Sequence, residues 1–145
     1  SQTGHLVLST LHTNDAPATL TRLQHMGIAG FHLASSVVLV CAQRLLRRLC
    51  AHCKRPDPLR EGFVPVGCAQ CLQGYRGRLA IHQVMPISAA LQSLMLEKAS
   101  ANALATQAAK DGVRTLREAG VQRVLAGDTS WDEVLAATHD QAHAG

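Results

Sequence analysis

The chain has 145 residues, enough for one domain or for a small domain with an appendage. Hydrophobic residues make up 47% of it and aromatic residues only 3%, so its core must be aliphatic; its longest apolar run, residues 37–42, is too short to span a bilayer. The formal charge of +4 is concentrated in residues 44–78, where eight Lys and Arg accompany two acidic residues. A basic strip of this kind can bind nucleic acid, acidic lipid headgroups or an acidic partner protein. Because Phe63 and Tyr75 are its only aromatic residues, base stacking is disfavoured. We interpret the strip as a solvated surface that offsets a negatively charged metal site.

The first predicted element is a short strand at Leu6–Leu8. A run of large apolar residues is typical of a strand buried on both faces of a parallel sheet. Ligands bind beyond the carboxyl ends of such strands. Here that place is taken by the polar residues Ser9, Thr10, His12, Thr13 and Asn14. The alternative is an ordinary polar loop that leads into a helix, with Asp15 as its cap and Pro17 in its first turn.

Two helices are predicted next, over residues 15–26 and 31–42. Pro17 near the start of the first and Gly27 after its end are typical boundary residues. The second helix is apolar on most sides, as in a helix wedged between layers. Residues 43–49 and 78–85 then predict the two strands of a hairpin.

Four cysteines lie at the tip of this hairpin. Cys50 and Cys53 form one Cys-x-x-Cys pair, Cys68 and Cys71 form another, and 14 residues separate the two pairs. Two such pairs supply the tetrahedral set of thiolates that zinc prefers, and a closed four-thiolate site has a structural role. Disulfides and a redox pair are the competing interpretations. His52 lies inside the first pair, but four cysteines already complete the set.

After Pro86 the pattern is helical. Helices are predicted from the Ser88 cap onward, over residues 102–110 and 115–126, and after a cap at Thr129 or Ser130.

The residues Thr3-Gly-His-Leu-Val-Leu-Ser-Thr-Leu-His-Thr-Asn-Asp-Ala16 closely resemble the histidine box of secretion ATPases that drive type IV pilus assembly and type II secretion, the GspE/PilB family. Residues 47–53 resemble the entry to that family's tetracysteine motif, and residues 68–78 its exit. Residues 81–87 also have the family's form. Retraction-type ATPases generally lack the four cysteines, so the resemblance favours assembly or secretion.

The resemblance implies an α/β fold: the C-terminal portion of a RecA-like P-loop ATPase core with an inserted tetracysteine zinc module and a C-terminal helical bundle. The implied parts are the core with the histidine box (residues 1–49), the zinc module (50–77), a returning core strand (78–87) and the helical bundle (88–145).

The same resemblance implies the site residues. His5 and His12 are expected to act in catalysis, by sensing or polarising the γ-phosphate of ATP. Thr10, Thr13 and Asn14 are expected to be their nucleotide-binding neighbours. The zinc ligands would be Cys50, Cys53, Cys68 and Cys71, and the full-length parent would also use ATP and Mg²⁺.

The resemblance further implies a homo-hexamer in the cytoplasm, peripheral to the inner membrane, with an inner-membrane platform protein as partner. We expect no nucleic-acid partner and no transmembrane segment.

A phosphate-binding loop needs glycines before a Lys-Ser/Thr pair, and none of Lys54, Lys98 and Lys110 has that context. We therefore expect a C-terminal piece of a longer ATPase that is inactive alone. The residues do not separate pilus assembly from type II secretion, although the resemblance at residues 83–88 and 115–120 favours pilus assembly. Two further alternatives are a zinc ribbon that binds nucleic acid and a structural interaction domain that lost its ATPase half.

Overall fold

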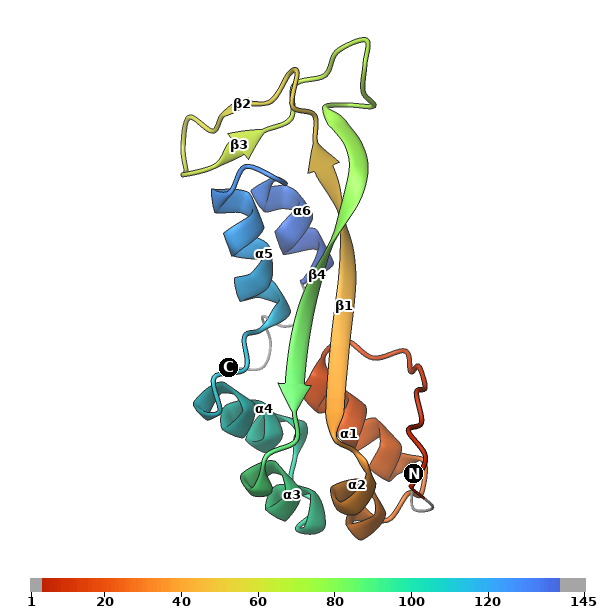
Figure 1. Cartoon of the computed structure of the whole chain (residues 1–145). Coiled ribbons are helices and arrows are strands. Elements are labelled where there is room, and N and C mark those ends of the chain that lie inside the picture. The colour runs from red at the N-terminus through yellow and green to blue at the C-terminus, as the bar shows by residue number, and fades with distance from the viewer. Residues whose placement is uncertain (1–3, 139–145) are drawn as a thin grey trace. The chain divides into compact units, whose positions relative to one another are not determined.

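The computed structural model describes residues 4–138, which form two units (Figure 1). The first unit contains residues 4–42 and 83–114, and the second contains residues 43–82 and 115–138. Strands β1 (Leu39–Leu49) and β4 (Tyr75–Pro86) each belong partly to one unit and partly to the other.

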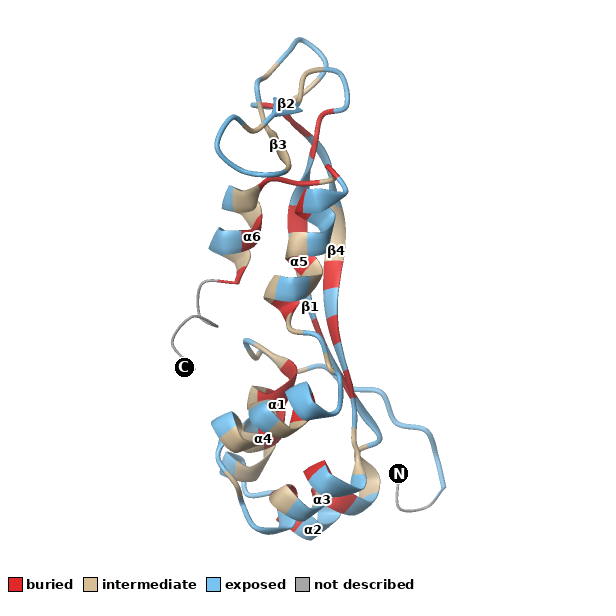
Figure 2. Ribbon diagram, turned by 90° about the vertical axis from the view of Figure 1, so that its left-hand side faces the viewer, coloured by how far each residue is buried: buried red, intermediate tan, exposed pale blue. Residues whose placement is uncertain are grey.

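Four helices make up most of the first unit: α1 (Ala16–His25), α2 (Gly30–Ser36), α3 (Ala89–Leu96) and α4 (Ala101–Lys110). α1 packs against α4, and α2 packs against α3. Each helix carries both buried and exposed residues (Figure 2), as expected for amphipathic helices around a small core. The largest apolar side chains of that core are Leu20, Leu33, Met85, Leu91, Met95 and Leu104. None of the helices in residues 4–138 combines the length and hydrophobicity needed to cross a membrane.

The predicted first helix is confirmed, with the expected caps. The side chain of Asp15 accepts a hydrogen bond of 2.8 Å from the backbone N–H of Ala18, and Pro17 lies in the first turn. Ser88 caps α3 in the same way. These short polar residues satisfy backbone donors that a helix leaves without a partner at its start.

The predicted helix over residues 31–42 is wrong in its second half. α2 ends at Ser36, and the following apolar residues enter β1. Val40 and Ala42 are buried, whereas Cys41 between them is exposed, which is the period-two pattern of a strand with one covered face. The run looked helical because its exposed positions are also apolar.

The predicted hairpin is confirmed, and both strands are longer than expected. β1 and β4 pair and run in opposite directions (Figure 1). In β4, Ile81, Gln83 and Met85 are buried while His82 and Val84 are exposed. The ribbon therefore has one buried face and one exposed face.

The second unit combines the rest of this ribbon with α5 (Leu116–Leu125) and α6 (Trp131–Ala137), which pack against each other. Thr115 and Glu118 form a reciprocal capping box at the start of α5. Gly120 lets α6 approach closely: a Cβ atom at that position would lie 2.6 Å from Cγ1 of Val134. A pair of very short strands, β2 (Arg55–Pro56) and β3 (Phe63–Val64), pairs antiparallel within the hairpin tip.

The helices after Pro86, expected to form one bundle, are divided between the two units. α3 and α4 belong to the first unit, and α5 and α6 belong to the second. The apolar faces of α3 and α4 pack on α2 and α1, so they are already covered within the first unit. The remainder of the expected bundle, residues 139–145, lies outside the described residues.

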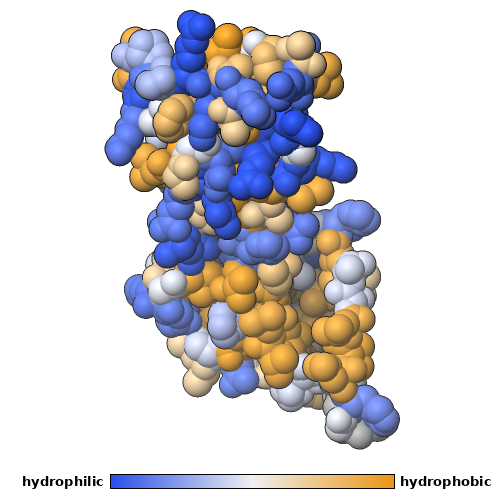
Figure 3. Space-filling model, turned by 45° about the horizontal axis from the view of Figure 1, so that its top comes forward, coloured by the Kyte–Doolittle hydropathy of each residue, from blue (hydrophilic) through white to orange (hydrophobic). Residues whose placement is uncertain are grey.

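Residues 5–13 form neither a helix nor a strand, so the strand predicted at Leu6–Leu8 is absent. Leu6 is 81% exposed, Val7 60% and Leu8 86%. A strand needs a hydrogen-bonding neighbour, and the long described strands pair only with each other. Broad hydrophobic areas are visible on the surface (Figure 3), and an exposed apolar segment of this kind indicates a surface that another part of a protein covers.

Candidate functional site

The four cysteines of the hairpin tip lie together in the second unit. The Sγ atoms of Cys50, Cys53, Cys68 and Cys71 all lie within 4.8 Å of one another. Three of the separations are 3.9 Å (Cys50–Cys68), 3.7 Å (Cys53–Cys71) and 3.6 Å (Cys68–Cys71). Four sulfur ligands placed at the usual distance around a tetrahedral zinc ion lie about 3.8 Å apart. The thiols therefore already have the spacing of a zinc site.

Each Cys-x-x-Cys pair is held by a backbone turn. The N–H of Cys53 donates to the carbonyl of Cys50 at 3.3 Å, and the N–H of Cys71 donates to the carbonyl of Cys68 at 3.2 Å. Backbone donors also face the sulfurs, since the N–H of Gly67 lies 3.3 Å from Sγ of Cys53 and the N–H of Cys68 lies 3.3 Å from Sγ of Cys71. These donors stabilise negative charge on the ligand atoms.

The thiols affect one another's acidity. Burial raises the pKa of the Cys71 thiol, but hydrogen bonds from the backbone and the thiol of Cys68 lower it to about 7. A backbone hydrogen bond at Gln70 lowers the pKa of Cys68, but burial and the neighbouring thiols raise it to about 11. Ionisation of one thiol thus makes ionisation of the neighbouring thiols less favourable. A bound divalent cation would allow all four thiols to ionise.

The donor set fits zinc in a structural role. All four cysteines are free thiols, and the Cys68–Cys71 sulfur separation of 3.6 Å is well beyond the length of about 2 Å of a disulfide bond. Four thiolates would complete a tetrahedron and leave no position for water, so zinc held here would join two distant turns of the chain. His52, inside the first pair, is exposed and does not belong to the cluster.

A set of long-range contacts fastens the hairpin tip to α5 and α6. The ammonium group of Lys54 donates to the carbonyl of Gly127 at 2.7 Å and lies over the ring of Phe63. The indole N–H of Trp131 donates to the carbonyl of Glu61 at 2.8 Å. We call Lys54, Trp131 and their partners the ribbon clamp. Sequence reasoning did not identify it, because the clamp joins residues that lie 70 and 73 positions apart.

A buried hydroxyl pair also joins β4 to the start of α6. The hydroxyl group of Tyr75 lies 2.8 Å from Oγ of Ser130, and both residues are buried. The backbone N–H of Cys50 donates to the carbonyl of Gly74, next to Tyr75, at 2.8 Å. Cys50, β4 and the start of α6 are therefore connected within a few residues.

Several arginines of the basic strip pair with carboxylates rather than facing the cysteines. Arg47 contacts Glu133 at 2.6 Å, and Arg48 contacts Asp128 at 3.3 Å. The Arg47 guanidinium also lies 4.1 Å from the centre of the Tyr75 ring. These residues hold β1 against the α5–α6 segment, which is a structural use that the composition did not indicate.

The Arg47–Glu133 pair predicts a pH-dependent stability. Partial burial raises the pKa of Glu133, but hydrogen bonds from the Arg47 side chain and backbone N–H lower it overall. A carboxyl group whose pKa is lower in the folded than in the unfolded protein stabilises the fold at pH values above its unfolded pKa, which is about 4.5 for Glu133. This contribution is lost as the pH falls through the pKa of the folded state. We expect Glu133→Gln to reduce the free energy of unfolding by about 1 kcal/mol at pH 7 and by much less at pH 3. Urea titration at both pH values measures this. Glu97→Gln, which removes an exposed carboxylate just after α3, should have little effect, and an equal loss at both pH values for Glu133→Gln would contradict the assignment.

The predicted nucleotide residues lie in the first unit, on the segment that leads into α1. His5, Thr10, His12 and Asn14 are exposed, and Thr13 is half-buried. All of them lie on one short segment of the first unit, residues 5–14. Their expected roles stay predictions.

Thr13 takes part in the start of α1. Its hydroxyl lies 2.7 Å from that of Thr19, and it also contacts the carbonyl of Asp15. The side-chain oxygen of the buried Gln83 accepts a hydrogen bond of 2.9 Å from the N–H of Ala16. The first donors of α1 are therefore occupied by protein groups, which agrees with the alternative of a capped helix for residues 13–15.

Comparison with known proteins assigns the chain to a class. The sequence model of the type II/IV secretion system proteins matches residues 1–136, and the chain belongs to this family.

Among its relatives is the type IV pilus assembly ATPase PilB of Pseudomonas aeruginosa, which is 45% identical, with 97% of this chain and 28% of the relative covered. The type II secretion system protein HxcR of the same species is 44% identical, with 97% and 30% covered. The HofB homolog of Escherichia coli, a protein transport protein, is 43% identical, with 93% and 32% covered. The chain thus spans about three-tenths of the length of these relatives.

Proposed function

We propose that this chain is the C-terminal part of a hexameric ATPase that powers type IV pilus assembly by hydrolysing ATP. The observation that carries the proposal is its identity of 42–45% to four pilus assembly ATPases over at least 92% of its length. The parent would work in the cytoplasm at the inner membrane, against a membrane-embedded platform protein, and we expect no nucleic-acid partner.

In this proposal the exposed apolar segment Leu6–Leu8 becomes a strand of a RecA-like sheet, which the rest of the parent completes. Burial of three large side chains would contribute on the order of 5 kcal/mol to that association. His5 and His12 would then lie at the end of a buried strand, where ligands of α/β sheets bind. Thr10, Thr13 and Asn14 would supply further hydrogen-bonding groups there.

The role of the histidines would be electrostatic. An imidazole N–H donates a hydrogen bond, and a donor fixed beside the terminal phosphate stabilises the charge that develops during transfer. ATP would bind with Mg²⁺ through groups supplied by the rest of the parent, since no lysine here lies in a phosphate-binding loop.

The four cysteines would hold zinc, whose contribution is structural. The Cys50–Cys53 and Cys68–Cys71 turns would be joined through the ion, and the ribbon clamp would transmit their position to α5 and α6. The second unit would thereby form a rigid body that moves as a whole when the motor turns over.

Type II secretion is the second candidate, because type II secretion proteins match equally well, at 41–44% identity. The two are separated by expressing the full-length protein in strains that lack either the assembly ATPase or the secretion ATPase. We expect restored surface pili in the first strain. Restored secretion without pili would replace the main proposal by the second.

The 145-residue chain alone should not hydrolyse ATP. It lacks a phosphate-binding loop, so release of phosphate by the purified chain should equal the buffer background, whereas the full-length protein should turn over. If the isolated chain still releases phosphate after repeated purification, the proposal that ATP hydrolysis needs the rest of the parent is wrong.

A further inference from the structure

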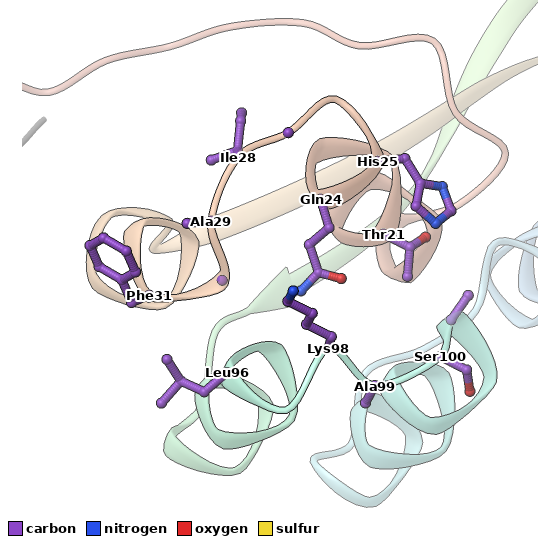
Figure 4. A pocket seen from close by; sticks show the side chains of 13 residues that line it. Thr21, Gln24, His25, Ile28, Ala29, Phe31, Leu96, Lys98, Ala99 and Ser100 are labelled. Carbon is purple, nitrogen blue, oxygen red and sulfur yellow. The ribbon is translucent and has the colours of Figure 1, made fainter.

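A pocket of about 850 Å³ opens in the first unit, away from both the histidine segment and the cysteines in sequence. It lies between the end of α1, the start of α2 and the loop from α3 to α4 (Figure 4). Its wall is mostly apolar and includes Ile28, Phe31 and Leu96, which are 37%, 58% and 56% exposed. Large apolar side chains at the mouth of a concave site are typical of a binding groove.

The shape of the pocket is fixed by contacts beneath it. The side-chain amide of Gln24 on α1 donates to the carbonyl of Met95 on α3 at 3.0 Å. The backbone of Gly30 also packs against this carbonyl, since a Cβ atom there would lie 2.5 Å from the oxygen. α1, α2 and α3 thus meet at one carbonyl group, and the pocket exists before any ligand arrives.

Lys98 occupies an unusual position at this pocket. It follows the end of α3 with a φ of 54°, in the left-handed region that glycine adopts most easily. A lysine here costs stability relative to glycine, and such cost is typical of functional positions. In Figure 4 its side chain lies between the wall of Phe31 and Leu96 and the opposite wall of Thr21 and His25.

Lys98 is the charged side chain of the pocket. Within the part of the chain that the structure describes, no aspartate or glutamate lines the pocket beside it. Among residues 4–138, no carboxylate forms an ion pair with Lys98. An apolar surface with an unneutralised cation is complementary to an apolar ligand that carries an acid.

From these observations we infer that the pocket binds an amphipathic acidic segment of a partner protein. Apolar side chains of the segment enter beside Phe31 and Leu96, and a carboxylate of the segment pairs with Lys98. This recognition mode is that of an amphipathic helix in a groove. The inference does not depend on ATP hydrolysis, so its failure would leave the proposed function untouched.

Two synthetic peptides test the inference on the 145-residue chain. The first is an amphipathic helical peptide of about 14 residues with leucines on one face and flanking glutamates, and the second carries lysine in place of each glutamate. We expect the acidic peptide to bind and to shift the amide NMR signals of residues 24–31 and 96–101, and the basic peptide to bind at least about fivefold more weakly.

Lys98→Gly separates recognition from folding. Glycine suits the left-handed position, so the variant should melt about 3 °C higher. It should nevertheless bind the acidic peptide about fivefold more weakly, because the ion pair is gone. Lys110→Gln, which changes an exposed lysine at the end of α4, is the matched control and should bind as the unchanged chain does.

Three results would overturn the inference. The first is equal binding of both peptides. The second is undiminished binding by the Lys98→Gly variant. The third is decanoate binding in the pocket when neither peptide binds, because that would indicate a site for a small amphiphile instead of a protein segment.

Discussion

Replacement of Cys50 by serine is expected to abolish the proposed zinc binding and to unfold the second unit. Cys50 is 1% exposed, and its sulfur lies 3.9 Å from that of Cys68. A structural zinc site contributes on the order of 10–16 kcal/mol in small zinc-binding peptides. If removal of one ligand releases the ion, the free energy lost exceeds the free energy of unfolding of most small domains. Zinc content should fall from one ion per chain to near zero, and the amide NMR signals of residues 43–82 should lose their dispersion.

Cys41→Ser is the matched control for this change. Cys41 lies on β1, the strand that ends just before Cys50, but it is exposed and stands outside the thiol cluster. Its replacement should leave zinc content and melting temperature unchanged. Removal of zinc by a chelator should reproduce the effect of Cys50→Ser. A chelated protein that keeps dispersed signals over residues 43–82 would show that the clamp and the hydroxyl pair hold the unit without metal.

In the full-length protein, His12→Ala should lower the rate of ATP hydrolysis by about 10²- to 10³-fold. This is the usual cost of removing one fixed hydrogen-bond donor to developing charge. Zinc content and hexamer formation should not change, because His12 is exposed here and lies outside the cysteine cluster. Steady-state phosphate release at saturating ATP measures the effect on kcat.

His32→Ala serves as the control for His12→Ala. His32 is also exposed and lies on α2 of the same unit. It should leave hydrolysis within about twofold of the unchanged protein. Full activity of His12→Ala would remove this histidine from the mechanism, and an equal loss in both variants would indicate a general effect on the first unit.

The helices were predictable because their signals are local. Asp15, Ser88, Thr115 and Ser130 each cap a helix through a hydrogen bond to a donor three residues later. The cysteine cluster could also be predicted from the sequence, because the two Cys-x-x-Cys pairs are themselves a local signal.

The errors arose where burial depends on distant residues. The first residues of β1, 39–42, are apolar on both faces of the strand, so their composition does not reveal that burial alternates along it. The Lys54–Gly127 contact also could not be predicted, because every residue has a backbone carbonyl and the sequence does not show which one accepts this hydrogen bond. The prediction of a strand at Leu6–Leu8 was wrong for a third reason. A strand forms only beside a hydrogen-bonding neighbour, and each described strand is paired with another described strand instead.

We propose that in the longer protein the exposed segment before α1 becomes part of a nucleotide site. A structure of the full-length protein with Mg²⁺ and a non-hydrolysable ATP analogue would show where this segment lies. We predict that Leu6–Leu8 lie in a sheet and that a ring nitrogen of His12 lies within hydrogen-bond distance of the terminal phosphate. A solvent-exposed loop at Leu6–Leu8, with the nucleotide bound elsewhere, would refute the proposed site.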